Sequence, residues 1–163
     1  MNATRVVIVA LLLALLITLH FTLRPLLDWR AGVDFLVIGA LVVAVRARPA
    51  VAAVVGFLLG LMLDAMNPQA LGSAALAMTI VAFTASRMKA AFFADNVALN
   101  AIFILLGKVV FDLVATLAEG RLHGMTLVWQ LIAWTPLSAL ATAIVGVAVM
   151  AIVRPALEER PRR

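Results

Sequence analysis

The ionisable side chains best suited to carry chemistry in this 163-residue chain are Asp64, Lys108 and Asp112, which lie within long apolar segments. Asp64 ends an apolar run that begins near Ala52, and Lys108 and Asp112 lie four residues apart in a later run. Ionisable groups at membrane depth are costly and mark proton relays, substrate pathways or buried ion pairs. Asp64 is therefore a candidate for catalysis, for carrying a proton, or for a structural bond within a helix bundle.

Lys108 and Asp112 share a helix face, because residues at i and i+4 do so. The order Lys before Asp is the weaker of the two i,i+4 orientations. If the helices that carry Asp64 and Asp112 run in the same direction, the two carboxylates reach similar depths. We therefore expect all three side chains to be buried and Asp64 to have a polar or cationic partner, with Lys108 as the leading candidate. A proton relay is the alternative interpretation.

Other kinds of reactive site find little support in the sequence. The chain has no Cys, which excludes disulfides, thiolate nucleophiles and Cys-ligated metals. His20 and His123 are the two histidines, and neither has further ligands at a spacing typical of metal sites, so we interpret both as interfacial residues. The sequence has no Ser/His/Asp order, phosphate-binding glycine loop or HExxH motif. We predict no catalytic residue, cofactor or metal ion.

Small residues form ridges along the apolar segments. Residues four apart share a helix face, and small ones allow another helix to approach closely. Each ridge is therefore either a packing surface within this chain or an interface for a partner helix. The ridges are Ala52, Gly56 and Gly60, which end in Asp64; Ser138, Thr142 and Gly146; and a weaker pair, Ala10 and Ala14.

The composition indicates an integral membrane protein. Hydrophobic residues make up 66% of the chain and charged residues 13%, whereas a soluble domain has roughly 25% charged residues. The net charge of +5 does not indicate nucleic-acid binding, because the basic residues lie at the ends of apolar runs, as membrane topology signals do. We expect contact with the lipid bilayer and none with nucleic acid.

Six apolar segments predict an all-α bundle of six transmembrane helices in a single polytopic domain, residues 1–163. Residues 6–23 lack an A-x-A-like cleavage site and are interpreted as a retained anchor. Segment 32–45 is short for a span, which needs about 20 residues, so we expect it to be tilted, thin or partly re-entrant. Pro136 favours the first turn of a helix, which predicts a short interfacial helix at 127–134. The predicted spans are 6–23, 32–45, 50–66, 71–87, 97–118 and 135–153, followed by a polar cytoplasmic tail, 154–163.

Basic residues and tryptophans predict the same orientation, with both termini in the cytoplasm. Lys and Arg favour the cytoplasmic side, and Trp favours the membrane interfaces. In this topology Trp29, Trp129 and Trp134 all fall at the outer face. Nine basic residues lie inside (Arg5, Arg46, Arg48, Arg87, Lys89, Arg154, Arg160, Arg162 and Arg163) and three outside (Arg24, Arg30 and Arg121).

The segment Val55–Phe83 resembles the signature region of the rod shape-determining protein MreD family. That family carries a Gly-Phe-x-x-Gly-x-x-x-Asp element, a short loop, and then Leu-Gly-x-x-Ala-Leu. Arg46-Ala47-Arg48-Pro49 before it, and Trp134 and Pro136 after it, also fit, although Thr135 separates a Trp and a Pro that are often adjacent in the family. The matching residues are Gly56, Phe57, Gly60, Asp64, Leu71, Gly72, Ala75 and Leu76.

The resemblance implies a non-enzymatic scaffold subunit of the bacterial cell-elongation (rod) complex in the cytoplasmic (inner) membrane. The implied direct partner is MreC, a single-span protein. MreB and the RodA and penicillin-binding-protein synthases of lateral peptidoglycan synthesis are indirect partners. The family's fold resembles the six-helix substrate-binding subunit of energy-coupling-factor vitamin transporters, which supplies the alternative function. The short outer loops and the absence of Tyr argue against that alternative.

Overall fold

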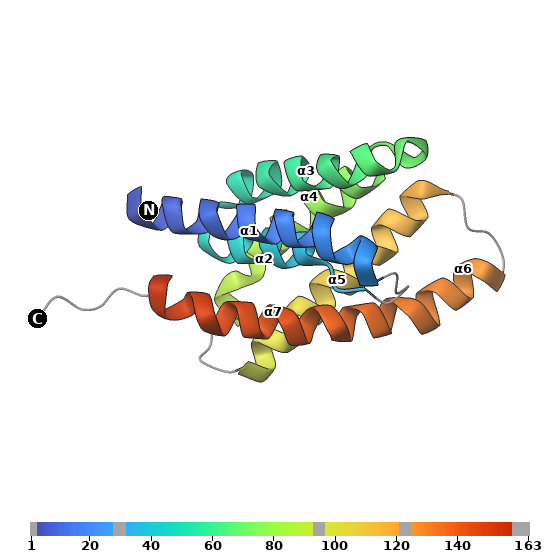
Figure 1. Ribbon diagram of the computed structural model, residues 1–163. Coiled ribbons are helices and arrows are strands. Elements are labelled where there is room, and N and C mark those ends of the chain that lie inside the picture. The colour runs from blue at the N-terminus through green and yellow to red at the C-terminus, as the bar shows by residue number, and fades with distance from the viewer. Residues whose placement is uncertain (1–2, 28–31, 93–96, 121–124, 158–163) are drawn as a thin grey trace, which may run out of the picture.

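The part of the chain that the structure describes is helical, as the composition predicts. The computed structural model describes residues 3–27, 32–92, 97–120 and 125–157 (Figure 1). Each of the six expected apolar segments corresponds to a helix, although residues 32–34 and 71–72 precede the helices of their segments. The elements are α1 (Ala3–Leu27), α2 (Phe35–Arg46), α3 (Pro49–Met66), the 3₁₀ turn η1 (Pro68–Ala70), α4 (Ser73–Phe92), α5 (Val97–Glu119), α6 (Met125–Trp129), the π-helical turn η2 (Gln130–Trp134) and α7 (Thr135–Leu157).

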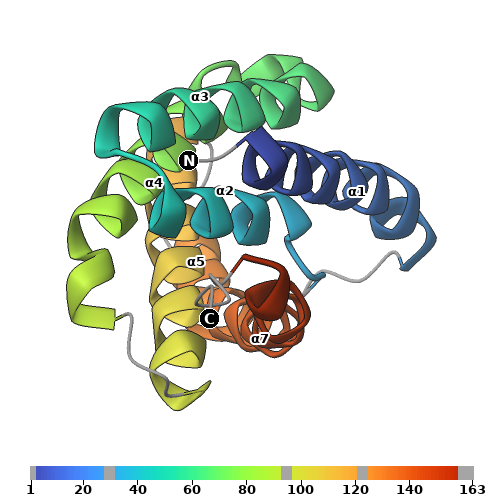
Figure 2. The same cartoon turned by 90° about the vertical axis from the view of Figure 1, so that its left-hand side faces the viewer.

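The short helix α2 forms the centre of the bundle. Ten of its 12 residues are buried, and it contacts α1, α3, α4, α5 and α7 (Figure 2). A helix that is apolar on every side must be surrounded by other apolar groups. Here those groups are protein side chains, so a helix of about 18 Å need not match the thickness of a membrane. The enclosure by neighbours explains why segment 32–45 is shorter than the other apolar segments.

Four helical stretches are long and apolar enough to cross a membrane: Val6–Leu23, Pro49–Met66, Val97–Glu119 and Gln130–Ile152. α2 and α4 are shorter apolar helices, so the six-span topology stays a prediction. α1 begins and α7 ends at the same end of the bundle (Figure 1), as an even number of crossings requires. α7 continues to Leu157, so the first residues of the expected polar tail are helical.

The predicted orientation, with both termini in the cytoplasm, also stays a prediction. Trp29, Arg30, Arg121, His123 and residues 158–163 lie outside the described residues. Of the other two tryptophans, Trp129 is 63% exposed and Trp134 is partly buried.

The interfacial helix expected at 127–134 is not a separate element. The backbone passes from α6 through η2 into α7 in helical conformation, with Trp129 and Thr135 both in the right-handed helical region. Pro136, the second residue of α7, lacks an N–H and its ring would clash with the carbonyl four residues earlier. The π-helical turn widens the backbone just before this proline, and the Thr135 hydroxyl donates to the Gln130 carbonyl oxygen at 3.3 Å. A local widening therefore replaces the expected break.

α3 and α4 pack so closely that the ridge of Ala52, Gly56 and Gly60 faces α4. A Cβ atom added to Gly56 would lie 2.6 Å from the Met78 carbonyl oxygen, and one added to Gly60 would lie 2.5 Å from the Ala74 carbonyl oxygen. Both obstacles are backbone atoms, which cannot move aside without moving a helix. The structure thus uses this ridge to join two helices of the same chain.

The second ridge, on α7, is also covered by the chain itself. The Ser138 hydroxyl donates to the Gly32 carbonyl oxygen, and the Thr142 hydroxyl accepts from the Asp34 N–H, both at 3.1 Å. A Cβ atom on Gly146 would meet the side chain of Ile104 at 2.9 Å. By contrast, Ala10 and Ala14 on α1 are exposed.

The close approach at Gly60 predicts that even one methyl group destabilises the protein. Overpacking a well-packed core costs about 1–3 kcal/mol, so we expect Gly60→Ala to lower the free energy of unfolding in detergent by that amount. Gly39→Ala is the matched control, because its Cβ atom would first meet the flexible end of Leu13 at 3.0 Å. Alanine also favours the helix over glycine by roughly 0.5–1 kcal/mol. Equal stabilities of the two variants would contradict the tight α3–α4 contact.

Candidate functional site

Asp64 lies in the last turn of α3 and binds the start of α4. Its Oδ2 atom accepts hydrogen bonds from the backbone N–H groups of Gly72 at 2.9 Å and Ala75 at 3.0 Å, and its Oδ1 atom accepts one from Ala74 at 3.0 Å. The residue is only 2% exposed. The first N–H groups of a helix have no partner within that helix, and a negative charge is favoured at this end. Asp64 thus caps α4 from a neighbouring helix.

The other members of the Val55–Phe83 motif divide into two groups. Gly72 has a φ of +95°, a left-handed conformation that glycine adopts at little cost, and it directs its N–H to Asp64. Together with Gly56, Gly60 and the buried Ala75, it shapes the turn between α3 and α4, for which we propose a structural role. The large apolar members are exposed: Phe57 by 46%, Leu71 by 68% and Leu76 by 52%.

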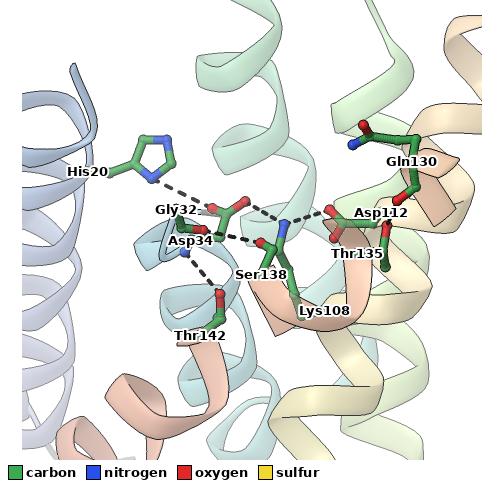
Figure 3. Close-up of polar contacts among 9 residues, drawn as sticks. All are labelled: His20, Gly32, Asp34, Lys108, Asp112, Gln130, Thr135, Ser138 and Thr142. Carbon is green, nitrogen blue, oxygen red and sulfur yellow. Dashed lines mark hydrogen bonds and ion pairs between the residues drawn. The ribbon is translucent and has the colours of Figure 1, made fainter. Parts of the chain in front are cut away.

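The prediction that Asp64 pairs with Lys108 is wrong. The Lys108 ammonium donates to Asp34 Oδ2 at 3.1 Å and to Asp112 Oδ1 at 2.5 Å (Figure 3). Asp64 instead finds three donors within eleven residues of itself. Lys108 is 5% exposed, so its charge is balanced by two carboxylates inside the bundle. The neighbouring charges on one face of α5 do meet, as their spacing predicts.

Asp34, just before α2, is the residue that the sequence analysis missed. It is 4% exposed. Its Oδ2 atom accepts from Lys108 on α5, its backbone N–H donates to Thr142 on α7, and its Oδ1 atom lies 3.6 Å from His20 Nδ1 on α1. One residue therefore contacts three helices (Figure 3). Asp34 lies within the expected span 32–45, so the rule that flagged Asp64 could have flagged it too.

His20, which the sequence analysis interpreted as an interfacial residue, is buried in the bundle. It is 2% exposed and faces Asp34, and its ring meets that of Phe21 edge to face, with the centroids 5.4 Å apart. A protonated imidazole at this position forms an ion pair with Asp34. The sequence could not show this contact, because it depends on how α1 lies against the start of α2.

These polar residues line a cavity of about 480 Å³ at one end of the bundle. The apolar side chains of Phe21, Leu63, Met66 and Phe111 complete its wall. Among the described residues, no group of three or more His, Asp or Glu side chains is placed to hold a metal ion. The site therefore combines carboxylates with the ammonium of Lys108 and the imidazole of His20. Its polar lining consists of His20, Asp34, Asp64, Asn67, Lys108, Asp112, Glu119 and Gln130.

The fold and this site define an all-helical membrane protein whose buried charges are bonded to one another and to helix ends. The family described as rod shape-determining protein MreD matches residues 2–154, and the chain therefore belongs to the MreD family. No curated protein and no solved structure matches, so the likeness to energy-coupling-factor subunits stays an expectation. Family membership and the four long apolar helices together indicate a multi-pass inner-membrane protein that determines rod shape.

The cap at α4 predicts a graded response to replacement of Asp64. Asp64→Leu leaves three N–H groups without an acceptor, those of Ala74 and Ala75 buried and that of Gly72 partly buried. Each buried unsatisfied group costs about 1–3 kcal/mol. Asp64→Asn keeps one acceptor oxygen, so we expect a smaller loss. Unfolding free energies of both variants in detergent check the order. If Asn and Leu were equally tolerated, the carboxylate would not be a cap.

The ion network predicts that Lys108→Met is among the most destabilising substitutions in the chain. Removing one partner of a buried ion pair costs about 3–5 kcal/mol, because the remaining charge is stranded, and here two carboxylates lose their cation. Arg87→Gln is the control. The exposed Arg87 guanidinium lies 5.3 Å from the centroid of the Phe83 ring, an arrangement worth about 0.5–1 kcal/mol at exposed sites. A Lys108→Met protein as stable as Arg87→Gln would refute the network.

Proposed function

We propose that this protein is a non-enzymatic scaffold subunit of the bacterial cell-elongation complex and that it binds the transmembrane helix of MreC. The match to the MreD family over residues 2–154 carries this proposal. The geometry supports it, because bonds within the bundle account for the buried charges. Asp64 caps α4, and Lys108 joins α5 to the start of α2. These side chains have a structural purpose that requires no catalytic step.

The exposed small residues of α1 are the face that we propose for MreC. Helices in lipid associate through close packing rather than through a hydrophobic drive. The ridges on α3 and α7 are covered by this chain, whereas Ala10 and Ala14 are exposed. α1 is also the least buried of the four long apolar helices, with 17% of its apolar window buried. In this proposal, a partner helix that packs against small residues therefore binds α1.

In this proposal the membrane contact holds MreC where wall synthesis takes place. With both termini of this chain in the cytoplasm, the bundle end that carries the cavity faces outward. The periplasmic part of MreC would then lie near the membrane surface, where the RodA and penicillin-binding-protein synthases work. MreB and these synthases are indirect partners, reached through the assembled complex.

The cavity is the observation that favours the alternative, a substrate-binding subunit of a vitamin transporter. Its volume of about 480 Å³ falls in the range of small-molecule sites, roughly 300–1,000 Å³. Three of its ionisable side chains, however, are already bonded within the chain: Asp34, Asp64 and Lys108. We therefore keep the scaffold as the proposed function.

Depletion of this protein in a rod-shaped bacterium distinguishes the scaffold function from the transporter function. We expect round cells with normal vitamin uptake, and rescue of rod shape by the wild-type gene. If depleted cells stay rod-shaped but lose uptake of one vitamin, the scaffold function is contradicted and the transporter-subunit function is supported.

Substitutions of exposed alanines test the proposed MreC face in the same cells. Ala14→Leu should fold normally yet lose co-purification with MreC, because a bulky side chain keeps the partner backbone away. Ala148→Leu, at an exposed alanine of α7, should co-purify as the wild type does. If Ala14→Leu retained MreC while depleted cells became round, the scaffold would stand and the α1 face would be wrong.

A further inference from the structure

Four buried or partly buried side chains form a row of alternating charge when His20 is protonated. His20 Nδ1 lies 3.6 Å from Asp34 Oδ1, Lys108 Nζ lies 3.1 Å from Asp34 Oδ2, and Asp112 Oδ1 lies 2.5 Å from Lys108 Nζ (Figure 3). The row connects α1, the residue before α2, and α5. Protonation of His20 adds a positive charge beside Asp34.

Histidine is the side chain whose unperturbed pKa lies nearest neutral pH, and His20 is the histidine of this site among the described residues. The other titratable groups around the cavity are the Lys108 ammonium and carboxylates. Asp64 on α3 is bonded to the start of α4, and Glu119 on α5 is partly buried. The described residues of α4 and η2 that line the cavity, Ala74 and Gln130, do not titrate. A cavity of this size holds several water molecules, which can bring protons to His20.

α1 contacts the buried charges of the bundle through His20. Its main helix contact is α2, and most of its apolar side chains are partly or fully exposed. The buried side chains of Val9 and Leu16 provide apolar packing, and His20 is the buried polar residue among its described side chains. An opposite charge at close range inside protein attracts far more strongly than in water.

We propose that protonation of His20 fastens α1 to the bundle and that loss of this proton loosens it. The sign follows from the row of charges. The imidazolium attracts Asp34, so the docked arrangement of α1 is favoured at low pH. As pH rises, the imidazole becomes neutral and its attraction to Asp34 is lost. α1 therefore responds to the pH at the cavity end of the bundle. This inference does not require that the chain bind MreC.

Distances between nitroxide labels test the proposal, because the chain has no native Cys. One label replaces the exposed Leu15 on α1 and the other the exposed Leu117 on α5. A second pair, at the exposed Phe57 on α3 and Leu117, serves as the control for the rest of the bundle. His123 is changed to Gln in every sample, so that His20 is the remaining imidazole, and its protonation is followed by ¹⁵N-histidine NMR in nanodiscs.

Between pH ~5 and ~8, the Leu15–Leu117 distance distribution should broaden or shift with the same midpoint as the His20 imidazole signal. The Phe57–Leu117 distribution should stay fixed. His20→Asn should show, at every pH, the distribution that the wild type shows at high pH. A constant Leu15–Leu117 distance while the imidazole titrates would overturn the proposal. So would a pH response that persists in His20→Asn, and this outcome would assign the effect to a carboxylate. If His20→Asn does not fold, the wild-type comparison alone decides.

Discussion

The ion pair between Lys108 and Asp34 is the interaction on which the rest of the bundle depends. An ammonium group inside an apolar bundle is tolerated only if opposite charges reach it, and the carboxylates of Asp34 and Asp112 do so at 3.1 and 2.5 Å. The pairing fixes the start of α2 against α5, while Thr142 holds the Asp34 backbone from α7. From this anchor α2 runs through the core with almost every residue buried.

Asp64 is also a buried charge that needs a partner, but its partner is of a different kind. There the positive partner is the N-terminal end of α4, whose N–H groups donate hydrogen bonds to the carboxylate. Gly56 and Gly60 allow α4 to approach α3, and Gly72 turns the chain so that its N–H points back. In these two arrangements, most of the buried charged side chains among the described residues form bonds that join one helix to another.

The helices could be predicted from hydropathy, because length and apolar content are local properties of a segment. Six apolar segments in the sequence correspond to helices in the structure, and the family motif was recognisable from its spacing. The pairing of charged side chains, in contrast, depends on contacts between residues that are far apart in the sequence. Asp34 and Lys108 are 74 residues apart, and the sequence shows only that each needs a partner. A ridge of small residues likewise predicts close packing, but whether the chain itself or another protein covers the ridge depends on the whole fold. The structure shows self-coverage on α3 and α7 and exposure on α1.

Two double-mutant cycles test the central claim most directly, because they measure which carboxylate is coupled to Lys108. The first combines Asp34→Asn with Lys108→Met, and the second combines Asp64→Asn with Lys108→Met. Groups in one ion-pair network show coupling energies of about 0.5–3 kcal/mol, whereas separate groups add. The account predicts coupling in the Asp34 cycle and additivity in the Asp64 cycle, measured as free energies of unfolding in detergent. Coupling in the Asp64 cycle with additivity in the Asp34 cycle would contradict it.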